Sequence, residues 1–286
     1  MGRIIPLAML YLVRDHLFPV LVFLHALLAG APPRDGHGRF ARLGRRYAVT
    51  RLARGDSAGL VWTHGDGGTA ATLYLAGLDG RLRGTLPLVP LANIDWEELT
   101  RDPAGRFYIG DFGNNRNDRR DLAIYRVTPG AGRARVDTIA FRYPDQAAFP
   151  PPPARRHFDC EAMVFYHDTL HLFTKDRSRA HCTRYYVVPA RPGRYVATLR
   201  DSLRLGTLVT GAALRPDGQA VALLGYGALF LFGGPPSARL FHQPKSYRRL
   251  PSTGQAESVV FLTGQDLLLG NERGWLFWAT YRPKGK

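Results

Sequence analysis

Residues 95–115 read DWEELTRDPAGRFYIGDFGNN, and this stretch decides the fold. Residues typical of strands lie on both sides of a turn at Asp102-Pro103-Ala104-Gly105. The sequence therefore predicts two antiparallel strands joined as a hairpin. Both ends of the predicted hairpin are unusually polar, because three carboxylates surround a tryptophan at its start and an acidic, asparagine-rich corner follows its second strand.

The same pattern recurs along the chain. DWEEL (95–99), DCEAM (159–163) and QAESV (255–259) align on their first apolar residue, which brings Glu97, Glu161 and Glu257 into register. Fourteen residues after each glutamate a polar residue ends the next strand, and these residues are Asp111, Lys175 and Asn271. A fourth copy, TGAAL (210–214), places Ala212 at the glutamate position and Tyr226 fourteen residues later. DSAGL (56–60) suggests a shortened first copy, and an aromatic-rich third strand follows in every copy.

Short strands between turns, without sustained helical periodicity, indicate an all-β protein. Hairpin units that recur about every 40 to 60 residues are typical of propeller blades. The five copies predict a five-bladed β-propeller, and a blade hidden between residues 95 and 159 would make six. That interval contains Pro150-Pro151-Pro152-Pro153, which we interpret as a loop insertion. We expect an N-terminal strand at Tyr47–Leu52 to complete the last blade and close the ring.

The N-terminal 31 residues contain two apolar runs, and the second ends in Ala29-Gly30-Ala31. This layout is typical of a secretory signal peptide. The alternative is an uncleaved membrane anchor, because the two runs together are long enough to span a bilayer. We predict an exported protein (periplasmic, cell-surface or secreted) that contacts a membrane only through this segment if it is uncleaved. Residues 32–45 form a predicted linker, and residues 46–286 the propeller domain.

The formal charge of +16 comes almost wholly from arginine, and the arginines are scattered in pairs along the chain. Specific nucleic-acid binding usually needs a clustered basic surface, so we do not predict it. The two cysteines, Cys160 and Cys182, are too few for a disulfide framework or a zinc site. Because the repeat places them on non-adjacent strands, we expect free, buried thiols.

In a propeller the first strand of each blade lines the central channel. Residues two apart on a strand share a face, so Asp95 with Glu97, and Asp159 with Glu161, are predicted to point inward while Trp96 and Cys160 face the core. Like charges this close raise one another's pKa or need a counter-charge, such as Lys175 or an arginine. The predicted ligand or channel residues are Asp95, Glu97, Glu98, Asp111, Asn114, Asp159, Glu161, Lys175, Glu257, Asn271 and Glu272.

Carboxylate and amide oxygens are the ligands that Ca²⁺ prefers. We therefore predict a Ca²⁺ site with Glu97, Glu161 and Glu257 as its ligands. The alternative is that the acids bond to backbone amides at strand ends and tie the blades together.

The segments SGL-V-WTHGD, NIDWEEL, YIGDFGNN, FDCEAMVFY and QAESV resemble those of an exported bacterial β-propeller family without an assigned activity. That family is similar in turn to the NHL/TolB-like and the phytase- or lactonase-like propellers. The resemblance covers residues 47 to about 281 and implies a propeller with an acidic face, and several relatives hold calcium in the channel. The family usually has Asn-Asp-Ser-Gly where this chain has Gly65-Asp66-Gly67-Gly68, and an aspartate at Ala213, which implies a thinner ligand shell here.

Three functions follow from this pattern. We predict a binding or scaffold propeller with a Ca²⁺ or a small polar ligand in its acidic channel. The first alternative is a Ca²⁺-dependent hydrolase of an ester, lactone or phosphoester, in which the metal polarises an oxygen and a channel carboxylate acts as base. The second is a cell-surface protein–protein interaction module. No catalytic residue is assigned, because the chain has no G-x-S-x-G motif and its histidines have no triad spacing. We expect a monomer.

Overall fold

The computed structural model describes residues 38–42, 53–55, 59–178, 180–250 and 253–281. The predicted signal peptide or anchor, and the strand expected at Tyr47–Leu52, lie outside these residues. The described residues contain no α-helix and two short 3-10 helices, η2 (Pro153–Arg155) and η3 (Leu240–His242). No helix in this part of the chain is long and apolar enough to cross a bilayer.

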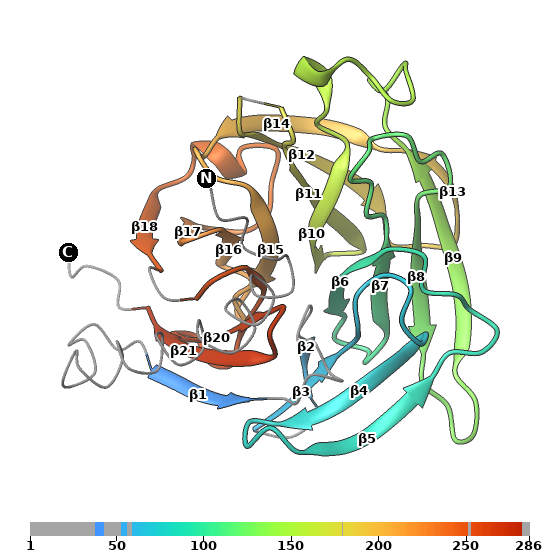
Figure 1. Cartoon of the computed structure of the whole chain (residues 1–286), viewed down its shortest axis with the longest axis vertical. Helices are drawn as coiled ribbons and strands as arrows, with labels where there is room; N and C mark the ends of the chain where they lie inside the picture. Colours follow the sequence, from blue (N-terminus) through green and yellow to red (C-terminus); the bar gives the residue numbers. More distant parts are fainter. Residues whose placement is uncertain (1–37, 43–52, 56–58, 179, 251–252, 282–286) are drawn as a thin grey trace, which may run out of the picture. The chain divides into compact units, whose positions relative to one another are not determined.

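Strands β1 to β21 form five sheets that follow one another round a ring (Figure 1). Blade 1 contains, from the inside outward, β2 (Ala53–Arg54), β3 (Leu60–Thr63), β4 (Thr72–Gly77) and β5 (Leu82–Pro87). Blade 2 contains β6 (Trp96–Arg101), β7 (Phe107–Asp111), β8 (Ala123–Thr128), β9 (Arg135–Arg142) and, at its outer edge, β13 (Gly193–Val196).

Blade 3 contains β10 (Asp159–Tyr166), β11 (Thr169–Lys175), β12 (Cys182–Pro189) and β14 (Thr198–Arg204). Blade 4 contains β15 (Val209–Leu214), β16 (Ala220–Gly225), β17 (Ala228–Gly233) and β18 (Lys245–Arg249). Blade 5 contains β19 (Ala256–Phe261), β20 (Asp266–Asn271), β21 (Trp275–Thr280) and β1 (Gly38–Arg42). The predicted all-β, five-bladed propeller is confirmed.

An N-terminal strand closes the ring, as predicted, but it is β1 and lies inside the predicted linker. Its sequence, GRFAR, lacks the regular alternation of apolar and polar residues that would predict a strand. An outer strand joins a sheet through backbone hydrogen bonds with the edge strand beside it. Its side chains therefore need no particular pattern, and the sequence gives little indication of the strand. The proline-rich stretch contains η2 and no strand, in agreement with its interpretation as a loop.

Blades 2 and 3 are braced by β13, which the sequence pattern did not reveal. This short segment leaves blade 3 between β12 and β14 and pairs in parallel with β9 of blade 2, from Gly193 opposite Ile139 to Val196 opposite Arg142. The excursion covers part of an outer edge that would otherwise present unpaired amides.

Five apolar clusters fill the spaces between successive blades. Trp96 and Leu99 lie together in the cluster between blades 1 and 2, both almost wholly buried. Two residues three apart on a strand share a face only where an extra residue interrupts the alternation. That residue is Glu97, which the pairing of β6 with β7 skips.

Equivalent bulges open the inner strands of blades 3, 4 and 5, where the skipped residues are Glu161, Thr210 and Glu257. The predicted register of the three glutamates therefore corresponds to one structural position. In blade 4, however, Thr210 occupies that position, and the alignment that placed Ala212 there is wrong. TGAAL has no acidic residue to anchor its alignment.

Both thiols are free, and they lie on β10 and β12, which are not neighbours in the sheet. Cys160 is buried as expected, whereas Cys182 is partly exposed.

Candidate functional site

The inner strands all begin at the same end of the ring, and most of the predicted site residues gather there. Three carboxylates at this end form one group, because an oxygen from each of Asp66, Asp95 and Glu97 lies within 4.8 Å of the other two. Asp66 is exposed, Asp95 is half-buried and Glu97 is buried. We call these three residues the acid trio.

Two glycines make room for the acid trio. A Cβ on Gly113 would lie 2.4 Å from the carboxyl carbon of Asp95 and 2.7 Å from Oε1 of Glu97. A Cβ on Gly67 would lie 2.8 Å from Oδ1 of Asp95. These distances are shorter than a carbon atom tolerates, so Asp95 occupies space that a side chain at either position would need, and Glu97 occupies space that a side chain at Gly113 would need.

Asn93 brings Asp66 to the start of β6. Its side-chain amide donates hydrogen bonds to the carbonyl oxygens of Gly65 (3.2 Å) and Asp66 (2.9 Å). Its carbonyl oxygen accepts the N–H of Trp96 at 3.0 Å. One buried side chain thus joins the loop after β3 to the strand that carries Glu97. Sequence analysis missed Asp66 as a site residue, because it lies outside the repeat and reaches the site through this loop contact.

Asp111 and Arg119 hold the backbone beside the acid trio. Oδ1 of Asp111 accepts the N–H of Asp95 at 3.2 Å and a guanidinium N–H of Arg119 at 3.1 Å. Arg119 also donates to the carbonyl oxygen of Gly113 and to Asp121. Burial raises the pKa of Asp95; Arg119 opposes this shift, and the carboxylates of Glu161, Asp66 and Asp111 add to it.

Blade 3 contributes two buried acids, each of which lies beside a basic side chain. Nζ of Lys175 lies 3.0 Å from Oε1 of Glu161, and Nε of Arg177 lies 2.5 Å from Oδ2 of Asp159. The backbone N–H of Asn114 donates to the other oxygen of Asp159 at 2.8 Å. Burial and the nearby Glu161 raise the pKa of Asp159 to about 7, although Arg177 and Lys175 act in the opposite direction. Arg177 is a second residue that sequence analysis missed.

Glu257 of blade 5 is bound by a tyrosine of blade 4. The phenol of Tyr226 donates to Oε1 of Glu257 at 2.7 Å, and Nζ of Lys175 lies 5.3 Å from the centre of the Tyr226 ring. Burial and Glu257 together raise the pKa of Tyr226 to about 12. Burial acts to lower the pKa of Lys175, but Glu161 and Glu257 outweigh it and raise the pKa above its ordinary value. Lys175 therefore supplies the counter-charge that the sequence suggested.

The three predicted calcium ligands thus meet different partners. Glu97 lies with Asp66 and Asp95, whereas Glu161 is bound by Lys175 and Glu257 by Tyr226. The predicted grouping of Glu97, Glu161 and Glu257 round one ion is therefore not the arrangement seen, and the acid trio is the group whose carboxylate oxygens lie close together.

Glu98 lies away from the acid trio and crosses the ring. Its Oε1 accepts the N–H of Leu99 at 2.9 Å, and its Oε2 accepts the N–H groups of Met163 (3.4 Å) and Ala212 (3.1 Å). The carboxylate of blade 2 therefore contacts inner-strand amides of blades 3 and 4. It is almost wholly buried, with 2% of Glu98 exposed, and it joins the inner strands of three blades.

The predicted amides have structural contacts. Asn114 donates to the carbonyl oxygen of Phe158 and accepts the N–H of Arg119, which ties blade 2 to the start of β10. Asn271 donates to Thr253 and accepts two backbone N–H groups of the β20–β21 turn. Glu272 is exposed beside Gln255.

The chain was compared with known proteins. No protein-family model and no curated protein matches it. Among solved structures it is similar to the PQQ-bound form of aldose sugar dehydrogenase from Streptomyces coelicolor, with 13% identity and a TM-score of 0.49 over 87% of this chain and 99% of that chain. It is also similar to a chain of the mitotic checkpoint complex, with 11% identity and a TM-score of 0.41 over 81% of this chain. The match spans 61% of that checkpoint-complex chain. Identities this low carry no information about activity.

Proposed function

We propose that the chain is an exported β-propeller binding protein that holds Ca²⁺ at the acidic end of its channel. The grouping of Asp66, Asp95 and Glu97 within 4.8 Å supports this proposal most strongly. Oxygen ligands lie about 2.3–2.6 Å from a calcium ion, so two ligands of one ion are at most about 5 Å apart. The spacing of the acid trio meets this limit.

The charges around the acid trio also favour a cation. Arg119, the cation that acts on Asp95, is itself bound to Asp111 at 3.1 Å. Burial and neighbouring carboxylates raise the pKa of Asp95. A bound cation would reverse this shift, because a nearby positive charge favours the ionised carboxylate.

The composition of the site suggests weak binding. The acid trio supplies three carboxylates, one of which is exposed, and water would complete the six to eight ligands of Ca²⁺. Calcium sites of extracellular modules bind with Kd values of about 10⁻⁴–10⁻³ M. Such an affinity suits the export that the N-terminal sequence predicts.

The test is thermal unfolding in EDTA and in 10 mM Ca²⁺, with Mg²⁺ at the same ionic strength as the control. For a Kd of about 1 mM, binding stabilises the fold by about 1.4 kcal/mol, which corresponds to a rise in Tm of about 3–6 °C. Glu97→Gln should abolish the rise, whereas Glu272→Gln, which changes an exposed glutamate outside the trio, should retain it. An equal rise in Mg²⁺, or an unchanged rise in Glu97→Gln, would reject the site.

A second candidate is the Ca²⁺-dependent hydrolase. Asp95 favours it, because this carboxylate lies half-buried in the acid trio and burial raises its pKa toward the range in which a general base works. Ca²⁺-dependent turnover of a p-nitrophenyl ester, lost in both Glu97→Gln and Asp95→Asn, would support catalysis. Calcium binding without turnover of ester, lactone or phosphoester substrates would reject the hydrolase and support the binding protein.

A further inference from the structure

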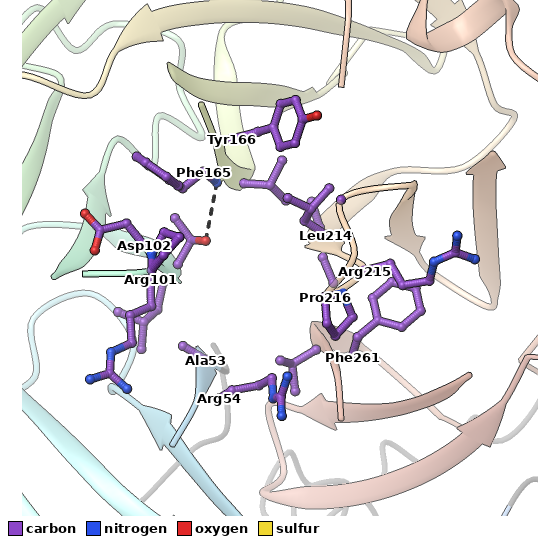
Figure 2. Close-up of a pocket in the computed structure, with 18 of the residues that line it drawn as sticks. Ala53, Arg54, Arg101, Asp102, Phe165, Tyr166, Leu214, Arg215, Pro216 and Phe261 are labelled. Carbon is purple, nitrogen blue, oxygen red and sulfur yellow. Dashed lines mark hydrogen bonds between the residues drawn. The ribbon is translucent and has the colours of Figure 1, made fainter. Parts of the chain in front are cut away.

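A cavity of about 1220 Å³ (Figure 2) opens at the end of the ring where the inner hairpins turn. The acid trio lies at the other end, where the inner strands begin. Its lining comes from all five blades and includes the last residues of the inner strands β6, β10, β15 and β19. Pockets for small ligands usually measure about 300–1,000 Å³, so the cavity has room for an organic molecule.

Glu98 lies on β6 between the acid trio and this cavity. The lining reaches Leu99 on β6, Val164 on β10 and Ala212 on β15. The carboxylate of Glu98 accepts the N–H of Leu99, of Met163, which precedes Val164, and of Ala212. Its hydrogen bonds therefore join three inner strands at the level where the lining of the cavity begins.

The wall and the rim of the cavity differ in chemistry. The wall carries apolar side chains that are at least partly exposed, namely Phe165, Leu214 and Pro216. Arginines of blades 1, 2 and 4 stand round the mouth, and Figure 2 shows Arg54, Arg101 and Arg215 on three sides of it.

The charges of the lining favour an anion. Four arginines (Arg54, Arg101, Arg106 and Arg215) face three aspartates (Asp102, Asp168 and Asp217). Asp102 is bound by Arg106 and Tyr108, and Asp217 is bound by Arg215. Asp168, the third aspartate of the lining, is exposed. The chain as a whole carries a formal charge of +16, which attracts anions to this mouth.

The hairpin of blade 3 at the rim has an unusual backbone. His167 and Asp168 both adopt left-handed conformations, with φ of 44° and 55°, where glycine or asparagine is usual. The imidazole of His167 stacks on the ring of Tyr166, with 4.0 Å between ring centres. Both conformations are those that a two-residue turn between the paired Tyr166 and Thr169 requires.

We propose that this cavity binds an amphipathic carboxylate, with its alkyl chain against the apolar side chains of the wall and its head group among the arginines of the rim. The site is independent of the proposed cation site, since it lies beyond Glu98.

The test is calorimetric titration of the full chain with octanoate, decanoate and dodecanoate below their micelle concentrations. Burial of the alkyl chain should raise the affinity about fourfold for each added methylene. Decyltrimethylammonium, which has the same chain as a ten-carbon ligand and the opposite charge, should bind much more weakly than decanoate. Equal affinities for the two head groups would overturn the proposal, because they indicate non-specific adsorption.

Two variants at the mouth and two controls locate the binding. Arg54→Gln should weaken decanoate binding about three- to fivefold, as expected for an exposed charge pair, and Leu214→Trp should block the cavity. Arg81→Gln, in the exposed β4–β5 turn of blade 1, and Glu97→Gln should leave the affinity unchanged. Thermal melts confirm that each variant folds. Unchanged affinity in both mouth variants would reject the cavity as the site, whatever the result with Ca²⁺.

Discussion

Removal of the Glu98 carboxylate should destabilise the propeller more than removal of any exposed acid. Glu98→Ala leaves the N–H groups of Leu99, Met163 and Ala212 without the acceptor that they have in the folded chain. An unsatisfied buried donor costs about 1–3 kcal/mol, so the three together set a range of about 3–9 kcal/mol. The 3.4 Å bond to Met163 is the weaker one, and water entering the vacated space restores part of the loss. We expect a net loss of about 2–4 kcal/mol.

Equilibrium unfolding in urea measures this loss, since a lower midpoint at unchanged slope reports stability alone. Glu98→Gln should fall between Glu98→Ala and the parent chain, because its amide retains one acceptor oxygen. Glu272→Ala is the matched control, and we expect a change within about 0.5 kcal/mol for this exposed glutamate. If Glu98→Ala unfolds at the same midpoint as Glu272→Ala, the carboxylate does not hold the three inner strands together.

Three further predictions concern residues at the acidic end of the ring. Because the pKa of Asp159 is raised to about 7, the folded chain keeps a proton that the unfolded chain loses above about pH 4. Its stability relative to Asp159→Asn should therefore fall as the pH rises from about 4 to 7, and urea titrations giving a constant difference would contradict the raised pKa. Tyr226→Phe removes the donor to Glu257 and should cost about 1.5–3 kcal/mol in the same assay; no loss would mean that Glu257 does not depend on the phenol. Gly113→Ala forces a Cβ against two carboxylates and should remove the Ca²⁺ response in thermal melts, whereas Gly132→Ala, where a Cβ meets no atom within 4 Å, should retain it.

The fold was predictable from the repeat, because each blade needs the same buried hairpin. Trp96 and the strands beside it must face the space between two blades, and a buried face leaves a pattern in the sequence. The closing strand β1 and the brace β13 leave no such pattern. Both pair through backbone groups at an outer edge, and those groups are the same in every residue except proline.

The candidate site was predictable in part. The register of Glu97, Glu161 and Glu257 was visible because each bulge falls at the same place in its strand. The membership of the acid trio was not visible, since Asp66 reaches Glu97 through the hydrogen bonds of Asn93. A contact between loops of two blades depends on the assembled ring, which no local spacing encodes.

The glutamates at the equivalent bulges of blades 2, 3 and 5 therefore have three different environments. At the bulge of blade 2 the glutamate faces two aspartates, at that of blade 3 a lysine, and at that of blade 5 a tyrosine. The difference comes from the end of the neighbouring second strand. Asp111 lies opposite the start of β6, whereas Lys175, one residue beyond the equivalent position in blade 3, reaches Glu161. Lys175 and Tyr226 bind two of the three glutamates, and the proposed cation would bind beside the third, where two aspartates add their negative charge.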